Sequence, residues 1–287
     1  GILEMPNARM MPEGQLRFNF SSSFPNEFTS LTASPFPWLE ATYRYVEIKN
    51  VKYGPASFSG NQSLKDKGFD IKTLIKKETA YFPAVSIGFR DIAGSGEFSS
   101  EYIVSSKKFG PLDLSLGLGW GVLGTDNNIT NPLGSFGDGF KTRDDNSELG
   151  GSFTVSNWFS GNTALFGGIE YDLPKRGLRL KMEYDTSNPD ARGSVTKVDS
   201  RVNVGLDYAF SESLDFSAAL ERGSQFRVSF RLKGNFLRDS IPKPRPKTIR
   251  RLNKEQKDRI LEDDAVFYTS LNVNLKQESI LIQAANL

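Results

Sequence analysis

The stretch PLDLSLGLGWG, Pro111 to Gly121, decides the fold class. From Leu112 to Trp120 every second residue is large and apolar, and the residues between are Asp113, Ser115, Gly117 and Gly119. Side chains alternate between the two faces of an extended chain, so this pattern predicts a β-strand. The leucines face either the core of a soluble β protein or the lipid around a membrane barrel, and the stretch alone leaves both open.

The same alternation recurs along most of the chain. Clear examples are QLRFNF at 15–20, LEATYRY at 39–45, LRLKMEY at 178–184 and FRVSFRLK at 226–233. We count about thirteen candidate strands between Gly14 and Gly234, separated by turn signals. Most connections are tight, and longer loops are expected near 48–67, 122–148 and 186–199. The arrangement predicts an all-β, antiparallel up-and-down barrel.

The odd number of candidate strands conflicts with barrel closure. In single-chain bacterial barrels the strand number is even and the long loops share one end. With thirteen strands the third long loop falls at the opposite end from the first two. One candidate is therefore not a strand, and the doubtful regions are Phe28 to Ala33 and 122–148. Twelve strands is the preferred number, and fourteen is the next.

Composition excludes several classes of function. The chain has 287 residues and balances 36 Lys plus Arg against 34 Asp plus Glu, with acids and bases interleaved, so no nucleic-acid partner is expected. Cysteine and histidine are both absent, which excludes disulfides, thiolate nucleophiles, Ser-His hydrolase sites and His-ligated catalytic metals. We expect no cofactor and no enzyme activity. Catalysis would have to use carboxylates, lysine or tyrosine.

The two ends of the chain differ from the middle. The N-terminal GILEMPNARMMPEG lacks the organisation of a signal peptide, so an exported protein would be in its mature form here, and residues 1–13 could plug a barrel. After Gly234, IPKPRPKTIRR at 241–251 predicts an extended linker, followed by a helix and one or two strands. We therefore divide the chain into 1–13, a barrel at 14–240, and a separate segment at 241–287.

The distribution of aromatic residues favours lipid over a soluble core. Aromatic side chains gather at predicted strand ends, as at Tyr43, Trp120, Tyr171 and Tyr208, where a membrane barrel meets the headgroups. The opposite strand faces carry charges of both signs, glycine or serine. A dozen strands with one apolar face need a large apolar environment, which lipid supplies. A soluble sandwich or a lipocalin-like barrel is the alternative.

Several segments resemble the YjbH family of bacterial exopolysaccharide biosynthesis proteins. They are GILEMPNARMMPEGQLRF, SPFPWLEATYRY, QSLKDKGFDIK, PAVSIGFRDIAGSGEFSSEYIVSSKKFGPLDLSLGLGWG and WFSGNTALFGGIEY. The resemblance covers most of residues 1–234. It implies an N-terminal outer-membrane barrel followed by a periplasmic α/β region, of which 241–287 would be the start. It also implies a role in exporting or assembling an extracellular polysaccharide or capsule, alongside periplasmic and lipoprotein partners, and it supplies no catalytic residues.

Inward-facing charges are the candidate polysaccharide contacts, because sugar hydroxyls bond to carboxylates and cations and a conduit needs many weak sites. These candidates are Arg17, Glu40, Arg44, Asp70, Arg90, Glu101, Arg179, Lys181, Glu183, Arg227 and Arg231. The same charges could instead pair across the lumen and fill it.

Three other readings remain beside export. The barrel could be a closed anchor or docking platform for periplasmic partners. Carboxylate pairs such as Asp66 with Asp70, or Glu97 with Glu101, could serve a glycosidase, although charges at this density usually form only the barrel wall. The basic run from Lys243 to Arg251 could meet anionic lipid or an acidic polymer, but such runs are more often solvated linkers.

Overall fold

A computed structural model describes residues 1–144, 155–173, 177–187, 198–238, 254–255 and 258. The chain divides into two compact units, Gly1–Asp239 and Ser240–Leu287. In the second unit Lys254, Glu255 and Asp258 are helical. The linker expected at 241–251 and the strands expected near the C-terminus lie outside the described residues.

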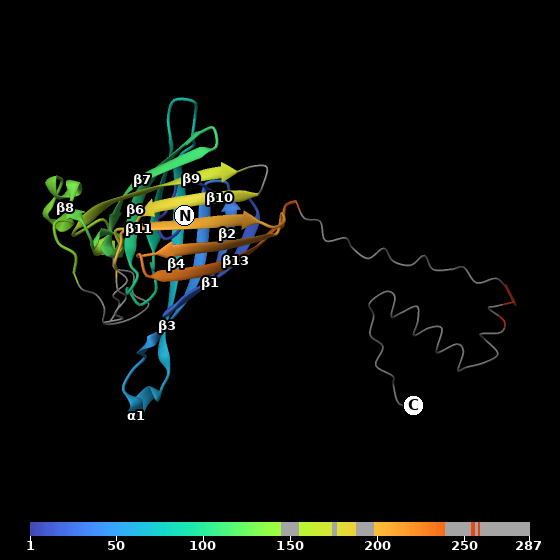
Figure 1. Cartoon of the computed structure of the whole chain (residues 1–287), viewed down its shortest axis with the longest axis horizontal. Helices are drawn as coiled ribbons and strands as arrows, with labels where there is room; N and C mark the ends of the chain where they lie inside the picture. Colours follow the sequence, from blue (N-terminus) through green and yellow to red (C-terminus); the bar gives the residue numbers. More distant parts are fainter. Residues whose placement is uncertain (145–154, 174–176, 188–197, 239–253, 256–257, 259–287) are drawn as a thin grey trace. The chain divides into compact units, whose positions relative to one another are not determined.

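Thirteen strands follow one another along the first unit (Figure 1). They are β1 (Gln15–Ser23), β2 (Asn26–Phe36), β3 (Leu39–Lys52), β4 (Ser63–Lys76), β5 (Ala84–Arg90), β6 (Ser100–Phe109), β7 (Leu112–Trp120), β8 (Asn128–Ile129), β9 (Thr163–Leu173), β10 (Leu178–Tyr184), β11 (Val202–Ala209), β12 (Leu214–Glu221) and β13 (Gln225–Asn235). A short helix, α1 (Ala56–Ser59), lies in the β3–β4 hairpin. Short 3-10 turns occupy Gly121–Gly124, Pro132–Ser135, Asp138–Phe140 and Val155–Asn157.

Twelve of these strands close into an antiparallel barrel. Each pairs with its neighbour in sequence, β7 pairs with β9, and β1 pairs with β13 from Gln15↔Asn235 to Ser22↔Val228. The two-residue strand β8 pairs with the first residues of β9 and takes no part in the ring. The expected all-β barrel of twelve strands is confirmed.

The thirteenth candidate strand was wrong, and its removal resolves the loop conflict. Phe28 to Ala33 lies within β2 and is a true strand. The wrong candidate is the alternation of Phe153 with Val155, which is counted among the thirteen and lies outside both doubtful regions. Val155 begins a 3-10 turn, and Phe153 lies outside the described residues. With twelve strands, the long connections 53–62, 91–99, 121–162 and 185–201 all leave one end of the barrel. We call this the long-loop end. The short connections 37–38, 77–83, 110–111 and 210–213 leave the other, the short-turn end.

The first long loop is shorter than expected because its strands are longer. β3 continues to Lys52 and β4 starts at Ser63, so the expected loop at 48–67 is mostly a projecting hairpin, seen below the barrel in Figure 1. The register shifts between Ile48 and Lys52, where the hairpin leaves the barrel wall. Sequence alternation alone does not reveal such an extension, because a solvated hairpin carries no apolar face.

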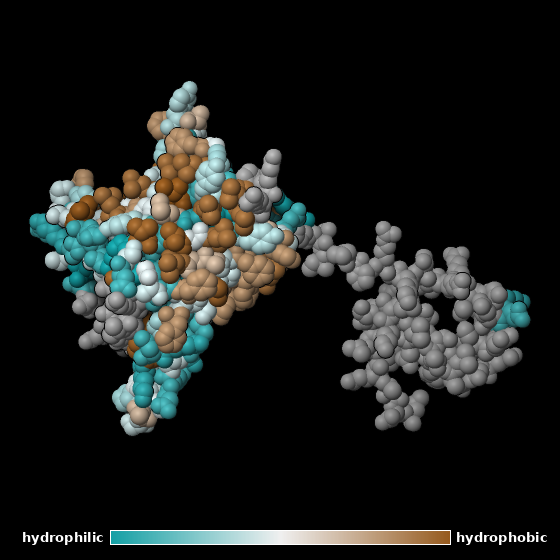
Figure 2. Space-filling view, in the orientation of Figure 1, coloured by the Kyte–Doolittle hydropathy of each residue, from teal (hydrophilic) through white to brown (hydrophobic). Residues whose placement is uncertain are grey.

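The outer face of the barrel is apolar. In β7, Leu116 is 61% exposed and Leu114 also lies on the surface, while the alternate residues Ser115 and Gly117 face inward and are buried. Exposed large apolar side chains recur on the other strands, including Leu165, Met182, Val204, Phe216 and Val228. Figure 2 shows brown apolar surface over the strands and teal polar surface toward the projecting hairpin and loops. The leucines of the opening stretch therefore face outward, as a membrane barrel requires.

Trp120 does not follow this pattern. Its side chain is only 1% exposed, and its ring lies edge-on to Phe159 with the centroids 5.1 Å apart. The expectation that Trp120 marks a headgroup layer is wrong, because residues of the long loop fold over it. Phe89 packs against the same loop through Trp158 and Phe159. Within the described residues, no helix is both long and apolar enough to cross a membrane.

A charge placed on the outer face tests whether that face meets lipid. Leu116→Arg should lower the free energy of unfolding by about 2–4 kcal/mol in lipid vesicles, the cost of a cation near the bilayer midplane. Phe58→Arg, at the 79% exposed tip of the β3–β4 hairpin, is the matched control and should change stability little. Urea titration of the folded fraction measures both. Equal, small effects would show that the apolar face does not lie in lipid.

Candidate functional site

The N-terminal residues lie inside the barrel, and we call residues 1–14 the lumen segment (Figure 1). Met5 is fully buried and Ala8 is 1% exposed. Both belong to an apolar cluster with Ala84, Tyr102, Val104 and Phe166 from the wall and Leu123 from the 3-10 turn after β7. The segment therefore adds a small hydrophobic core to an interior otherwise lined by polar groups.

Glu183 of β10 holds the first turn of the lumen segment. Its carboxylate accepts backbone N–H bonds from Leu3 at 2.8 Å, Glu4 at 2.9 Å and Met5 at 3.0 Å. The amide of Asn203 donates a further bond to Glu183 at 2.9 Å. Three amide groups inside the barrel thus share one acidic acceptor, and charge-assisted bonds of this kind are the strong ones.

Cationic wall residues bond to the carbonyl groups of the same segment. Lys181 donates to the Ile2 carbonyl at 2.7 Å, Arg90 to Glu4 at 2.8 Å and Lys72 to Arg9 at 2.6 Å. Buried backbone carbonyl groups need hydrogen-bond donors, and an irregular segment has no strand partner to supply them. The side chains of Lys181, Arg90 and Lys72 supply these donors instead. The lumen charges and the lumen segment complement each other.

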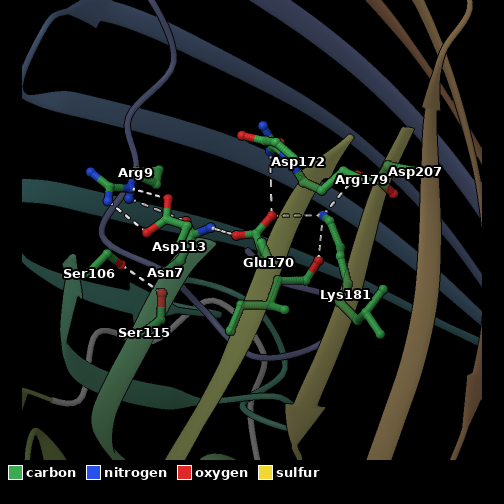
Figure 3. A network of polar contacts seen from close by, with 12 residues as sticks. Asn7, Arg9, Ser106, Asp113, Ser115, Glu170, Asp172, Arg179, Lys181 and Asp207 are labelled. Atoms are coloured by element: carbon green, nitrogen blue, oxygen red, sulfur yellow. Dashed lines mark hydrogen bonds and ion pairs between the residues drawn. The ribbon is translucent and has the colours of Figure 1, made fainter. Parts of the chain in front are cut away.

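A second set of contacts fixes the middle of the segment (Figure 3). The Asn7 side-chain amide donates to Glu170 at 2.8 Å, and the Arg9 guanidinium bonds to both oxygens of Asp113 at 2.7 Å. Ser106 accepts the Ala8 N–H at 2.9 Å and contacts Ser115 of the opening stretch at 2.7 Å. Asp113 and Ser115 therefore point inward to the segment.

Near the entry point, the segment is tied to the end of the last strand. Gly14 adopts a positive φ of 75°. Its carbonyl accepts the Phe236 N–H at 3.1 Å, and the Asn235 side-chain amide donates to the Glu13 carbonyl at 2.9 Å. Both ends of the barrel chain thus meet at the short-turn end.

The eleven predicted contact residues do not form one site. Toward the short-turn end, Glu40 pairs with Lys72 at 2.9 Å, and Lys181 and Arg231 both pair with Asp207, at 2.8 and 2.7 Å. Arg179 bonds to Asp172 and Glu170 at the rim. Arg17 makes no hydrogen bond or ion pair within the part of the chain that the structure describes.

The remaining predicted residues hold the lumen segment or the long-loop end. Arg90 and Glu183 contact the segment backbone, and Arg227 pairs with Glu4 and, at 2.9 Å, with Glu221. Glu101 pairs with Arg143 of the long loop at 2.7 Å. Arg44 lies 3.9 Å from both Asp70 and Asp91. Whether any of the eleven contacts a polymer stays a prediction.

Sequence reasoning missed several residues that organise the lumen. Glu170, Asp207 and Asp215 were not singled out, although each lies between outward apolar residues of its strand and so carries the signal of an inward position. Asn7 and Arg9 carry no comparable signal, because an irregular segment has no periodicity.

Asp91 lies at the long-loop end in a cavity of about 660 Å³. Its side chain is fully buried, and one carboxylate oxygen accepts the Phe98 N–H at 3.1 Å. Burial raises the pKa of Asp91 to about 6; Arg44 opposes this shift and the negative charge of Asp66 adds to it. Trp158 and Glu101 line the same cavity.

Comparison with known proteins identifies the family. The family model described as exopolysaccharide biosynthesis protein YbjH (YjbH) matches residues 1–286. The chain belongs to this family. The uncharacterized lipoprotein YjbH of Escherichia coli (strain K12) is 41% identical over 239 residues, covering 82% of this chain and 34% of that protein. This YjbH-family chain therefore spans about a third of that relative's length.

Similarity to solved structures is weaker. The KdgM porin in complex with disordered oligogalacturonate is 10% identical with a TM-score of 0.40, covering 77% of this chain and 99% of the porin. A mutant of the Rh. blastica porin is also 10% identical, with a TM-score of 0.29, covering 74% of this chain and 56% of the porin. Neither similarity carries a functional argument.

Removing the Glu183 carboxylate should release the start of the lumen segment. Loss of a buried acceptor costs about 1–3 kcal/mol, so in Glu183→Ala we expect hydrogen exchange at residues 3–5 to accelerate roughly tenfold or more. Exchange measured by mass spectrometry in detergent micelles checks this. Glu47→Ala, which removes a carboxylate bonded to Ser63 instead, should leave residues 3–5 unchanged. Unchanged exchange in both variants would mean that Glu183 does not hold the segment.

The raised pKa of Asp91 predicts a pH-dependent stability. The ionised form is disfavoured in the fold, so the contribution of Asp91 to stability should fall as pH rises from about 4 to about 6 and then level off. Asp91→Asn removes this dependence, and its stability relative to wild type should rise across that window by up to about 3 kcal/mol. Urea unfolding in vesicles across the pH range measures the difference. Asp138→Asn, on an exposed turn, should show none.

Proposed function

We propose that this barrel lies in the bacterial outer membrane and takes part in exporting or assembling an extracellular polysaccharide. The observation that carries the proposal is a closed barrel with an apolar outside and a polar inside, in a chain of the exopolysaccharide biosynthesis family. Partners in the periplasm, including lipoproteins of the same system, and outer-membrane lipid belong to the proposal. The chain spans about a third of its relative's length, so the activity of a whole protein of that length is part of the proposal too.

The distribution of loops supports an orientation. Bacterial outer-membrane barrels have short periplasmic turns and longer extracellular loops. On that rule the long-loop end faces outward, and the short-turn end faces the periplasm, together with Gly14 and Asn235. Asn235, at the end of β13, then lies on the periplasmic side, where export partners would reach this end of the barrel.

The lumen segment sets a condition on export through this barrel. Its contacts with Glu183, Ser106 and Glu40 run from one part of the wall to another, and a polymer could pass only if the segment moved. A conduit needs many weak binding sites. If the segment moved, the wall side chains that now bond to its backbone could bond to sugar hydroxyls instead. We propose that residues 1–14 close the conduit at rest.

The filled lumen also favours a second candidate function. A barrel whose interior is packed by its own chain can serve as a membrane anchor and docking platform for periplasmic partners without conducting anything. Glycosidase activity has less support, because the carboxylate of Glu101 is occupied by Arg143 and by the Phe159 N–H.

A reversible lock on the lumen segment separates export from anchoring. Residues 1–287 contain no cysteine, so Ala8→Cys and Ser106→Cys, whose parent residues are in contact, introduce the only pair of thiols in this part of the protein. In cells expressing the full-length protein, the oxidised lock should abolish polysaccharide in the medium, and a reductant should restore it.

The single variant Ala8→Cys controls for the substitution, and loss of free thiol confirms the lock. Normal secretion with the lock formed would exclude transport through this lumen and support the platform. Normal secretion in a strain lacking the protein altogether would contradict both candidates.

A further inference from the structure

A cavity of about 930 Å³ lies inside the barrel toward the short-turn end. It extends from rim residues such as Gly110 and Gly177 to the lumen segment at Asn7 and Met11. A volume of this size lies within the range of pockets that hold small ligands. The cavity lies at the opposite end of the barrel from the long-loop cavity around Asp91.

The charges that line this cavity do not balance. Five carboxylates face it, namely Glu40, Glu170, Asp172, Asp207 and Asp215. Six cations share those carboxylates as ion pairs: Lys72, Lys108, Arg179, Lys181, Arg231 and Lys233. Arg9 also reaches the cavity, but it is neutralised by Asp113 and Glu78 outside it. The acids are therefore outnumbered before Arg17 is considered.

Arg17 of β1 adds a further cation to this lining. It forms no hydrogen bond or ion pair among the described residues, although it lines both this cavity and a smaller one beside Asp70 and Arg90. Guanidinium groups inside proteins are normally bonded, because five donors left without acceptors are costly. An inward arginine whose donors face open space is arranged for an acceptor that enters the cavity.

We propose that this cavity binds carboxylate-bearing saccharide units, with Arg17 as the contact for the carboxylate; the inference rests on the proposed function and names its substrate class. The excess positive charge selects an anion, and Arg presents two parallel donors that match a carboxylate. The interleaved acids, such as Asp172 and Glu170, and the Asn7 side chain suit the hydroxyl donors of a sugar ring. A small inorganic anion would leave those acceptors without use.

Two substitutions should move affinity in opposite directions. Arg17→Gln removes the unpaired cation and should weaken binding of a glucuronate hexasaccharide roughly tenfold, the loss expected for one charge-assisted bond. Asp215→Asn removes an acid and releases Lys233, while Arg231 keeps its partner Asp207, and it should tighten binding severalfold. Lys52→Gln, on the distant hairpin, should change nothing.

Calorimetric titration of the full-length protein in detergent micelles tests the proposal. The probes are the glucuronate hexasaccharide, a neutral glucose hexasaccharide and inorganic phosphate at constant ionic strength. We expect binding of the uronate alone, weakened by added salt and altered by the two lumen variants as stated. Equal affinity for the neutral sugar, saturable binding of phosphate alone, or an unaltered uronate affinity in Arg17→Gln would each overturn it.

A folding control and a comparison with the secretion experiment distinguish failure of this inference from misfolding and from failure of the export proposal. Retained heat-modifiable gel mobility shows that the variants still form the barrel, so a lost signal is not misfolding. If uronate binding fails while secretion still depends on the lumen lock, this inference is wrong and the export proposal stands. If binding is found while secretion is independent of the lock, the site is real and the export route is wrong.

Discussion

The pairing of β1 with β13 is the constraint on which the rest of the structure depends. It joins the first and last strands, removes both free sheet edges and fixes the strand number at twelve. Once closed, the sheet has one outside and one inside, so the alternation along each strand sorts its residues into two environments. Apolar residues such as Leu116 and Val228 lie outside, and charges such as Glu183 and Lys181 lie inside.

Closure also creates the problem that the lumen charges solve. The segment at 1–14 forms no strand, so its amides and carbonyls need partners from the wall. Glu183 accepts three amides, and Lys181, Arg90 and Lys72 bond to three carbonyls. Each of these charged wall residues thus bonds to particular backbone groups of the irregular lumen segment. Arg17, which the segment leaves unused, stands out for that reason.

The sequence predicts the barrel because period-two alternation follows directly from which side of a sheet a residue faces. It predicts the inward position of ten of the eleven candidate residues for the same reason, with Asp70 and Arg227 as examples. The inward position expected for Glu101 is wrong, because Tyr102 and Val104 of β6 point inward to the lumen segment and Glu101 shares the other strand face with Ile103. It does not predict partners: Glu101 meets Arg143 across the long loop, and Arg227 meets Glu4 across the lumen. Trp120 shows the limit, since its alternation is correct while the loop that covers it has no pattern.

Two hydrogen bonds at the short-turn end join the lumen segment to the end of β13. Asn235 and Phe236 bond to the backbone of Glu13 and Gly14, so the C-terminal end of the lumen segment and the end of the last strand share one anchor. Tension on the chain beyond Asn235 loads this anchor before it reaches any strand pairing. Loosening these two bonds would therefore free the C-terminal end of the lumen segment and the end of β13 together.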